Sequence, residues 1–584
     1  MLNLCRIAYS GALAAIVLAG LALSVQSLRR DPMALQSFKF ESAAAWAIVL
    51  VGLTGFVIAT QLAPALYNPY DDFQYFLAHA VRMVETGTLY GSPLNALGGE
   101  VLGAQAFLQG FVVGFFPLKF INAADAVFCF FLSLALAGSV AFGRPKVWPA
   151  ALVGTLAVFL IDPQYENVSS LYSTVAMVCA LMIVTVDPRE WGEPGRAQWR
   201  RAAVPALFYA ALIALKNTGL VFCGLHLGIG AVMFCWTTGK WRAGLLNAGR
   251  ITVWSSIFLA PWLLLYAPYY LVALTQPIRT PLTPVPAVQE AHGIAVLFSP
   301  AETFYGGSLL AYTSLSLGLL LCSMFAMLRW RGHFRGGNPG QGALPALASA
   351  AAAGVASYLF WVLVGPRLQE LTHALRYAIP FLIGACSAAL PLWAAMTGRR
   401  DIAVCGSAIV LLVIFFASPL RERLGALLHQ NSQLAYLHRW NHGQLARNRD
   451  FEQWALAGQG AAAVHRLQEK IPPGQPFLAW TATPFLFDFH RNPIIDINIA
   501  GVGQLWGRIP RAPYLLLQYD GYGIPTEEVL QKDIKRNGRR VGMLDARALD
   551  VRHYLQMIPA SKIVADQDNI FLIRLDGDLP PPPN

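Results

Sequence analysis

One segment decides how the rest of the chain is interpreted: Tyr67-Asn-Pro-Tyr-Asp-Asp-Phe-Gln-Tyr-Phe-Leu-Ala-His-Ala-Val-Arg-Met-Val-Glu-Thr-Gly87. Two adjacent carboxylates, Asp71 and Asp72, stand where a helix would begin, a position that favours negative charge through the helix dipole. Helical spacing of the apolar residues behind them predicts a short amphipathic helix that lies on the outer membrane surface and stops near Gly87. Its apolar stripe consists of Phe73, Phe76, Leu77, Ala80, Val81 and Val84.

The composition on both sides of this segment is that of a membrane protein. Of the 584 residues, 56% are hydrophobic and 13% are charged, whereas a soluble domain carries about 25% charged residues. These values exclude an ordinary soluble enzyme, a disordered chain and a fibrous repeat. Charged residues make up about one in ten up to Leu420 and about one in five beyond it. The chain therefore divides into a membrane body, residues 1–420, and a water-soluble C-terminal domain, residues 421–584.

The membrane body is predicted to be a polytopic α-helical domain with about twelve transmembrane helices, because each span needs about 20 mainly apolar residues. Lys216 and Asn217 interrupt the apolar stretch 202–236, which we interpret as two spans. The expected spans are Leu4–Val25, Ala43–Leu66, Lys119–Phe142, Val147–Ile161, Leu171–Val186, Ala202–Leu215, Gly219–Trp236, Ile251–Leu274, Gly307–Trp330, Ala343–Val364, Tyr377–Met396 and Ile402–Leu420.

The sidedness of these spans follows from the Lys and Arg residues in the short loops. One set of loops is rich in them and is predicted to be cytoplasmic: it holds Arg29, Arg30, Lys39, Arg144, Lys146, Arg189, Arg196, Arg200, Arg201, Lys240, Arg242, Arg250, Arg329, Arg331, Arg335, Arg399 and Arg400. The acidic loop, the N-terminus and the C-terminal domain then face outward, on the periplasmic side of a bacterial inner membrane. The net charge of +11 thus reflects topology and not nucleic-acid binding.

The C-terminal domain is predicted to be a small α/β domain. A helix is expected at Val464–Ile471, and apolar runs between turns predict strands at Phe477–Trp480, Ile494–Ile497, Tyr514–Gln518, Val541–Leu544 and Ile570–Leu575. Nearby polar residues either bind an acceptor or form a structural cap: Asp488, His490, Arg491 and Asp496. The Pro-rich end, Pro580–Pro583, is expected to be disordered.

Cysteine usage gives no sign of a disulfide framework or of a zinc site. The eight cysteines lie between Cys5 and Cys405, in or beside apolar stretches, and none forms a Cys-x-x-Cys pair. We therefore expect no metal centre built on cysteine. The acidic pair Asp71 and Asp72 could hold a divalent cation, although no ligand spacing requires one.

Three motifs together resemble the GT-C superfamily of membrane glycosyltransferases, which includes protein O-mannosyltransferases and lipid A aminoarabinose transferases. The first is Asp-Asp-x-x-Tyr, followed by an amphipathic helix that ends in Gly. The second is the Lys-x-x-Gly turn in Leu215-Lys-Asn-Thr-Gly-Leu220. The third is Arg-Tyr-x-x-Pro in His373-Ala-Leu-Arg-Tyr-Ala-Ile-Pro380. The chain departs from the family in an extra N-terminal span and in the loop 91–100, which lacks the usual His, so no subfamily is assigned.

The resemblance implies a sugar donor carried on polyprenyl phosphate and direct displacement with inversion. Asp71 or Asp72 would be the general base that deprotonates an acceptor hydroxyl, and Asp71 is preferred because it lies nearest the membrane. Lys216 and Arg376 would bind the donor phosphate at the outer headgroup level. Each of these cations has a second interpretation, as a snorkelling residue or a headgroup anchor at the end of a span.

Further residues could support such a site. Tyr75 and Arg82 follow the acidic pair, and Glu166 lies on the next outer loop. Packing or solvation is the alternative role of each. His373 and Tyr377 belong to the third motif with Arg376 and are also candidates for supporting residues.

Other functions fit the same composition. A transporter or flippase would show internal repeats and charges near the bilayer midplane, but no clear repeat is present and the charges gather at one surface level. A polymerase or ligase of lipid-linked glycans shares the compartment and the substrate class. A structural or assembly membrane protein without catalytic activity is the last alternative, and the main evidence against it is the Asp-Asp loop. The acceptor, a glycan, lipid or protein, and the sugar are left open.

Overall fold

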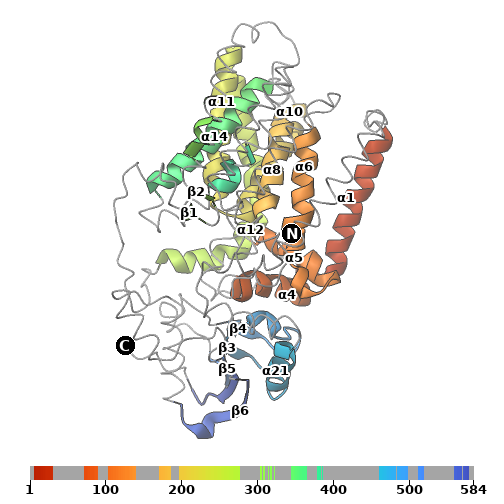
Figure 1. Cartoon of the computed structure of the whole chain (residues 1–584), viewed down its shortest axis with the longest axis vertical. Coiled ribbons are helices and arrows are strands. Elements are labelled where there is room, and N and C mark those ends of the chain that lie inside the picture. The colour runs from red at the N-terminus through yellow and green to blue at the C-terminus, as the bar shows by residue number, and fades with distance from the viewer. Residues whose placement is uncertain are drawn as a thin grey trace, which may run out of the picture.

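The computed structural model shows a helical body above a small domain that contains a β-sheet (Figure 1). It describes residues 5–30, 72–89, 103–139, 170–185, 196–275, 303–304, 307–308, 313–314, 316–318, 321, 343–364, 378–382, 384–385, 459–481, 483–496, 511–518, 558–568 and 570–577. The described helices of the body are α1 (Ser10–Arg30), η2 (Asp72–Phe76), α4 (Leu77–Thr86), α5 (Ala104–Phe115), η4 (Leu118–Phe120), η5 (Ala124–Cys129), α6 (Phe130–Ser139), α8 (Leu171–Thr185), α10 (Arg196–Leu215), α11 (Gly219–Thr238), α12 (Trp241–Thr275) and α14 (Ala343–Val364).

Several predicted spans coincide with described helices. The break at Lys216 and Asn217 is confirmed, because α10 ends at Leu215 and α11 begins at Gly219. Helix α14 has the expected bounds, Ala343–Val364. The predicted span at Gly307 is wrong at its start, since Gly307–Ser308 (β2) pairs with Thr303–Phe304 (β1) in a small antiparallel ladder. The spans Ala43–Leu66, Val147–Ile161 and Ile402–Leu420 lie outside the described residues.

The total of about twelve spans stays a prediction. Within the described ranges, one helix is long and apolar enough to cross a membrane, at Gly219–Trp236 in α11. Shorter apolar helices in the same ranges lie at Ser10–Gln26, Ala104–Phe115, Ala124–Leu136, Leu171–Thr185 and Ser349–Val362.

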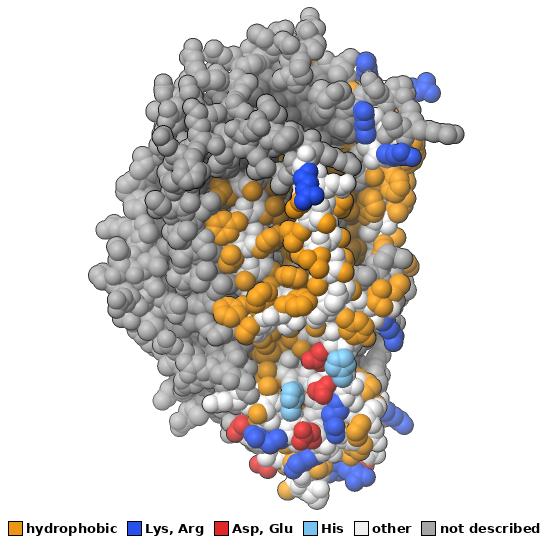
Figure 2. Space-filling view, turned by 90° about the vertical axis from the view of Figure 1, so that its right-hand side faces the viewer, with side chains coloured by type: hydrophobic (Ala, Val, Ile, Leu, Met, Phe, Trp, Pro, Cys, Tyr) orange, Lys and Arg blue, Asp and Glu red, His pale blue; other side chains and the backbone are white. Residues whose placement is uncertain are grey.

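The described surface of the body carries a band of hydrophobic side chains (Figure 2). Lys and Arg side chains gather at one end of this band, and the mixed charges of the C-terminal domain lie at the other. Exposed aliphatic side chains of the described helices include Leu18, Leu21, Leu207, Leu220, Ile257 and Leu264. Three exposed tryptophans, Trp199, Trp236 and Trp241, accompany the cationic end, as expected for residues at the level of lipid headgroups.

Helix α5 was not predicted from the sequence, and it fills the space between α4 and α1. A Cβ atom at Gly110 would lie 2.5 Å from Met83 Cε of α4, and one at Gly114 would collide with Ser10 of α1. Two glycines four residues apart lie on one helix face and let neighbouring backbones approach closely. The start of α1 is fixed in the same place, because the Ala8 N–H donates to the Gly87 carbonyl oxygen at 2.9 Å.

The C-terminal domain is built on a mixed five-stranded sheet with strand order β4-β3-β5-β7-β6. Its strands are β3 (Phe477–Trp480), β4 (Ile494–Asp496), β5 (Tyr514–Gln518), β6 (Ile563–Gln567) and β7 (Ile570–Arg574), and α21 (Gln459–Gln468) accompanies them. Strand β3 is parallel to β4 and β5, whereas β7 is antiparallel to β5 and β6. The α/β prediction is confirmed, although β6 was missed. The proposed strand Val541–Leu544 and the tail Pro580–Pro583 lie outside the described residues.

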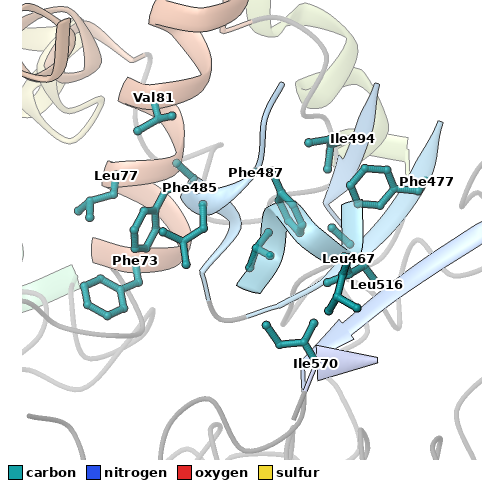
Figure 3. Close-up of a cluster of buried hydrophobic side chains, with 14 of the residues drawn as sticks. Phe73, Leu77, Val81, Leu467, Phe477, Phe485, Phe487, Ile494, Leu516 and Ile570 are labelled. Carbon is teal, nitrogen blue, oxygen red and sulfur yellow. The ribbon is translucent and has the colours of Figure 1, made fainter. Parts of the chain in front are cut away.

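The hydrophobic core of this domain extends into the membrane body (Figure 3). Phe73, Leu77 and Val81 pack in one cluster with Phe477, Phe485, Phe487, Ile494, Leu516 and Ile570. The expectation that this apolar stripe rests on the membrane surface is therefore wrong for its buried members. The physical reason is that the C-terminal domain covers the stripe, which leaves Phe73 and Leu77 with no exposed surface.

Candidate functional site

Asp72 of the acidic pair begins a helix, as predicted. Asp72 is the first residue of η2, one turn of π-helix that continues directly into α4. Its carboxylate is completely buried and lies at the positive end of the helix dipole. Asp71, the other member of the pair, lies outside the described residues. Helix α4 ends at Gly87, whose left-handed backbone (φ 72°) lets its N–H donate to the Met83 carbonyl oxygen at 2.8 Å.

The polar face of α4 carries His79, Arg82 and Glu85. Burial, together with the nearby Arg82 charge, lowers the pKa of His79 from 6.5 to about 3. Its ring is therefore neutral at pH 7 and supplies no positive charge that would attract a phosphate. The Arg82 guanidinium lies 5.9 Å from the centre of the Phe489 ring, close enough for a cation–π contact. Tyr75 belongs to η2, but its side chain lies outside the described set.

Glu85 connects this helix to the C-terminal domain. Its Oε2 atom accepts a hydrogen bond from the Phe489 backbone N–H at 2.8 Å. Burial raises the pKa of Glu85 above 4.5; the Phe489 hydrogen bond and His490 oppose this shift, and Asp488 adds to it. The carboxyl group therefore gains a proton more readily than a free glutamate does.

Lys216 lies in the turn between α10 and α11 and is half-buried. The turn is closed by a hydrogen bond of 2.8 Å from the Gly219 N–H to the Lys216 carbonyl oxygen. This short turn joins α10 to α11. It therefore lies at the end of the helix pair opposite Arg200, in α10, and Lys240, which follows α11. That is the outer side in the predicted topology.

The second sequence motif packs against the residue that directly follows the third motif. A Cβ atom at Gly219 would lie 3.1 Å from Phe381 Cζ, and the Phe222 ring stacks on the Phe381 ring with centroids 4.8 Å apart. Phe381 follows Arg376 by five positions in the sequence. The Lys-x-x-Gly turn therefore packs directly on the segment that continues from Arg-Tyr-x-x-Pro, a contact that spacing alone does not reveal.

Besides Asp71, four expected site residues lie outside the described residues: Glu166, His373, Arg376 and Tyr377. Their nearest described neighbours are Ser170, at the start of α8, and Ala378, which follows Tyr377. Their roles stay predictions. Within the described ranges, no group of three or more His, Cys, Asp and Glu side chains is arranged to hold a metal ion.

Asp125 is a buried acid that the sequence analysis missed. Its carboxylate accepts three backbone hydrogen bonds from the first residues of α8, at 3.1 Å from Leu171, 3.0 Å from Tyr172 and 2.7 Å from Ser173. These N–H groups have no partner within their own helix, so Asp125 caps α8 from the neighbouring η5. A lone acid inside the apolar stretch Lys119–Phe142 is the signal that could have found it.

Two of the polar residues grouped near Asp488, Asp488 itself and Arg491, make hydrogen bonds within the C-terminal domain. The Asp488 carboxylate accepts hydrogen bonds from the His490 and Arg491 backbone N–H groups at 2.9 Å and 3.1 Å. The Arg491 guanidinium donates to the carbonyl oxygens of Glu469 and Ile471 at 3.0 Å and 3.2 Å. Of the two interpretations given for this group, these contacts favour the structural cap.

No protein-family model and no curated protein matches the chain. Solved structures with a similar course of the chain include ArnT from Cupriavidus metallidurans in the apo state, with 13% identity, a TM-score of 0.45, and coverage of 91% of this chain and 98% of that one. The same protein bound to undecaprenyl phosphate matches with 12% identity and a TM-score of 0.45, over the same shares of the two chains. The apo oligosaccharyltransferase from Archaeoglobus fulgidus matches with 11% identity and a TM-score of 0.41, over 81% of this chain and 69% of that one.

At these identities and TM-scores, the likeness assigns no role to any residue of this chain.

Proposed function

We propose that the protein is an integral membrane glycosyltransferase that moves a sugar from a polyprenyl-phosphate donor to an acceptor hydroxyl at the outer face of the membrane. One observation carries the proposal. The Lys216 turn and the first residues of α11 pack through Gly219 and Phe222 on Phe381, the residue that directly follows Arg-Tyr-x-x-Pro. This contact supports a common site for the two motifs that resemble the donor-binding segments of the superfamily.

The position of these segments fits a lipid-linked donor. The apolar band of Figure 2 ends in cations and tryptophans on one side and in the C-terminal domain on the other, which is the distribution expected of a membrane-spanning body. A donor in the bilayer would present its phosphate at headgroup level, where Lys216 and Arg376 supply positive charge. Arg376 would add bidentate hydrogen bonds that a lysine cannot make.

The proposed reaction is a single displacement at the anomeric carbon. Asp71 or Asp72 takes the proton of the acceptor hydroxyl while its oxygen forms the new bond to that carbon. The bond from the anomeric carbon to the phosphate oxygen breaks, and the polyprenyl phosphate leaves with the electron pair. Attack from the face opposite the leaving group inverts the configuration. Lys216 and Arg376 stabilise the charge that grows on the departing phosphate.

The supporting residues have separate tasks in this proposal. Arg82 is placed over the Phe489 ring and so holds the helix that begins at Asp72. Tyr75, Glu166, His373 and Tyr377 are proposed to line the same cavity. A divalent cation bound by the acidic pair would assist the departing phosphate, and oxygen ligands of this kind suit Mg²⁺. The acceptor is a glycan, a lipid or a protein of the cell envelope, and the site faces the periplasm.

The experiment that tests the proposal separates it from the alternatives. The purified protein is reconstituted in vesicles and given a panel of radiolabelled polyprenyl-phosphate hexoses and pentoses together with membrane extract. Transfer of label to a water-soluble or lipid acceptor supports the proposal. Transfer from pyrophosphate-linked oligosaccharides alone would indicate a polymerase or ligase. Movement of the intact donor across the bilayer without transfer would indicate a flippase, and either of these results would overturn the proposal.

A further inference from the structure

One short segment of the C-terminal domain contacts the helix of the acidic pair at both of its ends. This docking segment comprises Pro484–Arg491 and begins with η11 (Pro484–Leu486). At the start of the helix, the rings of Phe73 and Phe485 meet edge to face with centroids 5.3 Å apart (Figure 3). At its other end, the Phe489 N–H donates to Glu85 at 2.8 Å.

The docking segment has a fixed shape of its own. The Gln468 side chain donates to the Asp488 carbonyl oxygen at 2.7 Å and accepts from the Asp488 N–H at 3.0 Å. Asn492 donates to the Pro472 and Gln475 carbonyl oxygens at 2.8 Å and 3.0 Å. Both amide side chains are buried. Hydrogen bonds to the end of α21 therefore hold the segment in place independently of its contact with Glu85.

The helix that it contacts has little stability of its own. Together η2 and α4 span 15 residues, Asp72 to Thr86, and isolated helices shorter than about 12–15 residues are marginal in water. Most of the stability of such a helix comes from packing of its apolar face. Here the docking segment and the strands behind it cover that face, and Phe73, the residue next to Asp72, is completely buried.

We propose that the docking segment is a positioning element for Asp72, acting through Phe485 on Phe73 and through Phe489 on Glu85. This inference rests on the proposed function, since it assigns the C-terminal domain a part in the same reaction. The domain would not touch the sugar or the phosphate through these residues. It would hold the acidic helix at the angle and depth that bring the carboxylate to the acceptor hydroxyl.

The test compares four variants in the reconstituted full-length protein. Phe485→Ala removes the contact at the start of the helix, and Glu85→Ala removes the acceptor of the Phe489 N–H. Glu85→Gln keeps an oxygen that can accept this hydrogen bond and is the rescue variant. Glu469→Ala is the matched control, because Glu469 is an exposed glutamate of the C-terminal domain and the change keeps the backbone carbonyl oxygen that accepts from Arg491.

Two readouts are taken on each variant. Hydrogen exchange of residues 72–86 is expected to speed up in Phe485→Ala and Glu85→Ala and to match the wild type in Glu85→Gln and Glu469→Ala. Turnover of a polyprenyl-phosphate sugar should fall about tenfold to hundredfold in the two disruptive variants while KM for the donor stays unchanged, because misplaced catalytic groups lower turnover and not ground-state binding.

The two proposals fail in different ways. Unchanged exchange of residues 72–86 in both disruptive variants would overturn the positioning inference, and so would faster exchange with unaltered turnover. If Phe485→Ala does not fold, Phe485→Leu, which keeps an apolar side chain but not the edge-to-face contact, replaces it in the same comparison. A wild-type protein that transfers none of the sugars would contradict the proposed function, whereas the exchange result would still decide whether the docking segment orders this helix.

Discussion

Glu85 and Phe489, 404 positions apart in the sequence, are joined by a hydrogen bond of 2.8 Å from the Phe489 backbone N–H to Glu85 Oε2. The carboxyl group is partly buried, and its pKa is raised above 4.5 chiefly by loss of solvent. Asp488 raises this pKa further, while the hydrogen bond and His490 lower it. The interface between the acidic helix and the C-terminal domain therefore contains a group that responds to mildly acidic pH.

The sign of this pH response can be predicted. A carboxyl group with a raised pKa in the folded state binds its proton more tightly there than in the unfolded chain. Its favourable contribution to the free energy of unfolding is therefore fully present below pH 4.5. This contribution is lost as the pH rises through the pKa that Glu85 has in the folded protein. Glu85→Gln does not titrate, so its melting temperature should rise relative to the wild type as pH increases from 4.5 towards 8. The measurement is thermal unfolding of both proteins in detergent across this pH range. A difference in melting temperature that does not change with pH would contradict a raised pKa at Glu85.

Gly87→Ala should destabilise the protein more than Gly239→Ala. Both glycines end a helix with φ 72°, where an alanine costs about 1–2 kcal/mol. A Cβ atom at Gly239 meets nothing within 4 Å, whereas one at Gly87 collides with the Arg6 carbonyl group. The two variants thus share the backbone penalty, and only one has the clash. A lower melting temperature for Gly87→Ala is expected, and equal losses would mean that the contact with Arg6 adjusts without cost.

Replacing Asp125 tests its role as the cap of α8. Asp125→Ala leaves the N–H groups of Leu171, Tyr172 and Ser173 without their acceptor in a buried site. The expected loss is about 3 kcal/mol or more, because each unsatisfied buried donor costs about 1–3 kcal/mol. Asp125→Asn keeps one carbonyl oxygen as acceptor and should lose less. Thermal unfolding of both variants gives the comparison, and an alanine variant as stable as the wild type would show that water replaces the carboxylate.

Lys216→Ala and Arg376→Ala should weaken binding of the donor. A hydrogen bond to a charged group contributes about 1.5–3 kcal/mol, which corresponds to a rise in Kd of about tenfold or more. Lys240→Ala is the control, since Lys240 is exposed at the opposite end of α11. Binding of a polyprenyl phosphate in detergent can be followed by calorimetry. Unchanged affinity in both variants would remove the phosphate role and leave the headgroup interpretation.

Local sequence signals predicted much of the helical body. The long apolar run Ala343–Val364 is a helix with those bounds, and the polar break at Lys216 separates two helices. Gly87 was recognised as a helix stop, since only glycine adopts its backbone angle without strain. These features depend on residues close together in the sequence, and spacing and residue type reveal them directly.

Features that depend on distant partners were not predictable. Periodicity showed that Phe73 and Leu77 share an apolar face, but it could not tell whether lipid or protein covers that face. The partner, Phe485, lies about 400 positions later in the chain. Asp125 was passed over because its three hydrogen-bond donors belong to another helix. The contact between Gly219 and Phe381 likewise joins two segments that are distant in the sequence, and no local pattern encodes it.

In the proposed reaction, a carboxylate of the acidic pair takes the proton of the acceptor hydroxyl. Single-turnover transfer of a radiolabelled polyprenyl-phosphate sugar is measured for the wild type, Asp71→Asn and Asp72→Asn, each with unchanged thermal stability. Asparagine keeps the size of the side chain but cannot act as the base. One of the two substitutions is expected to lower the rate of transfer about a hundredfold or more with little change in donor affinity. Transfer at the wild-type rate by both folded variants would contradict it.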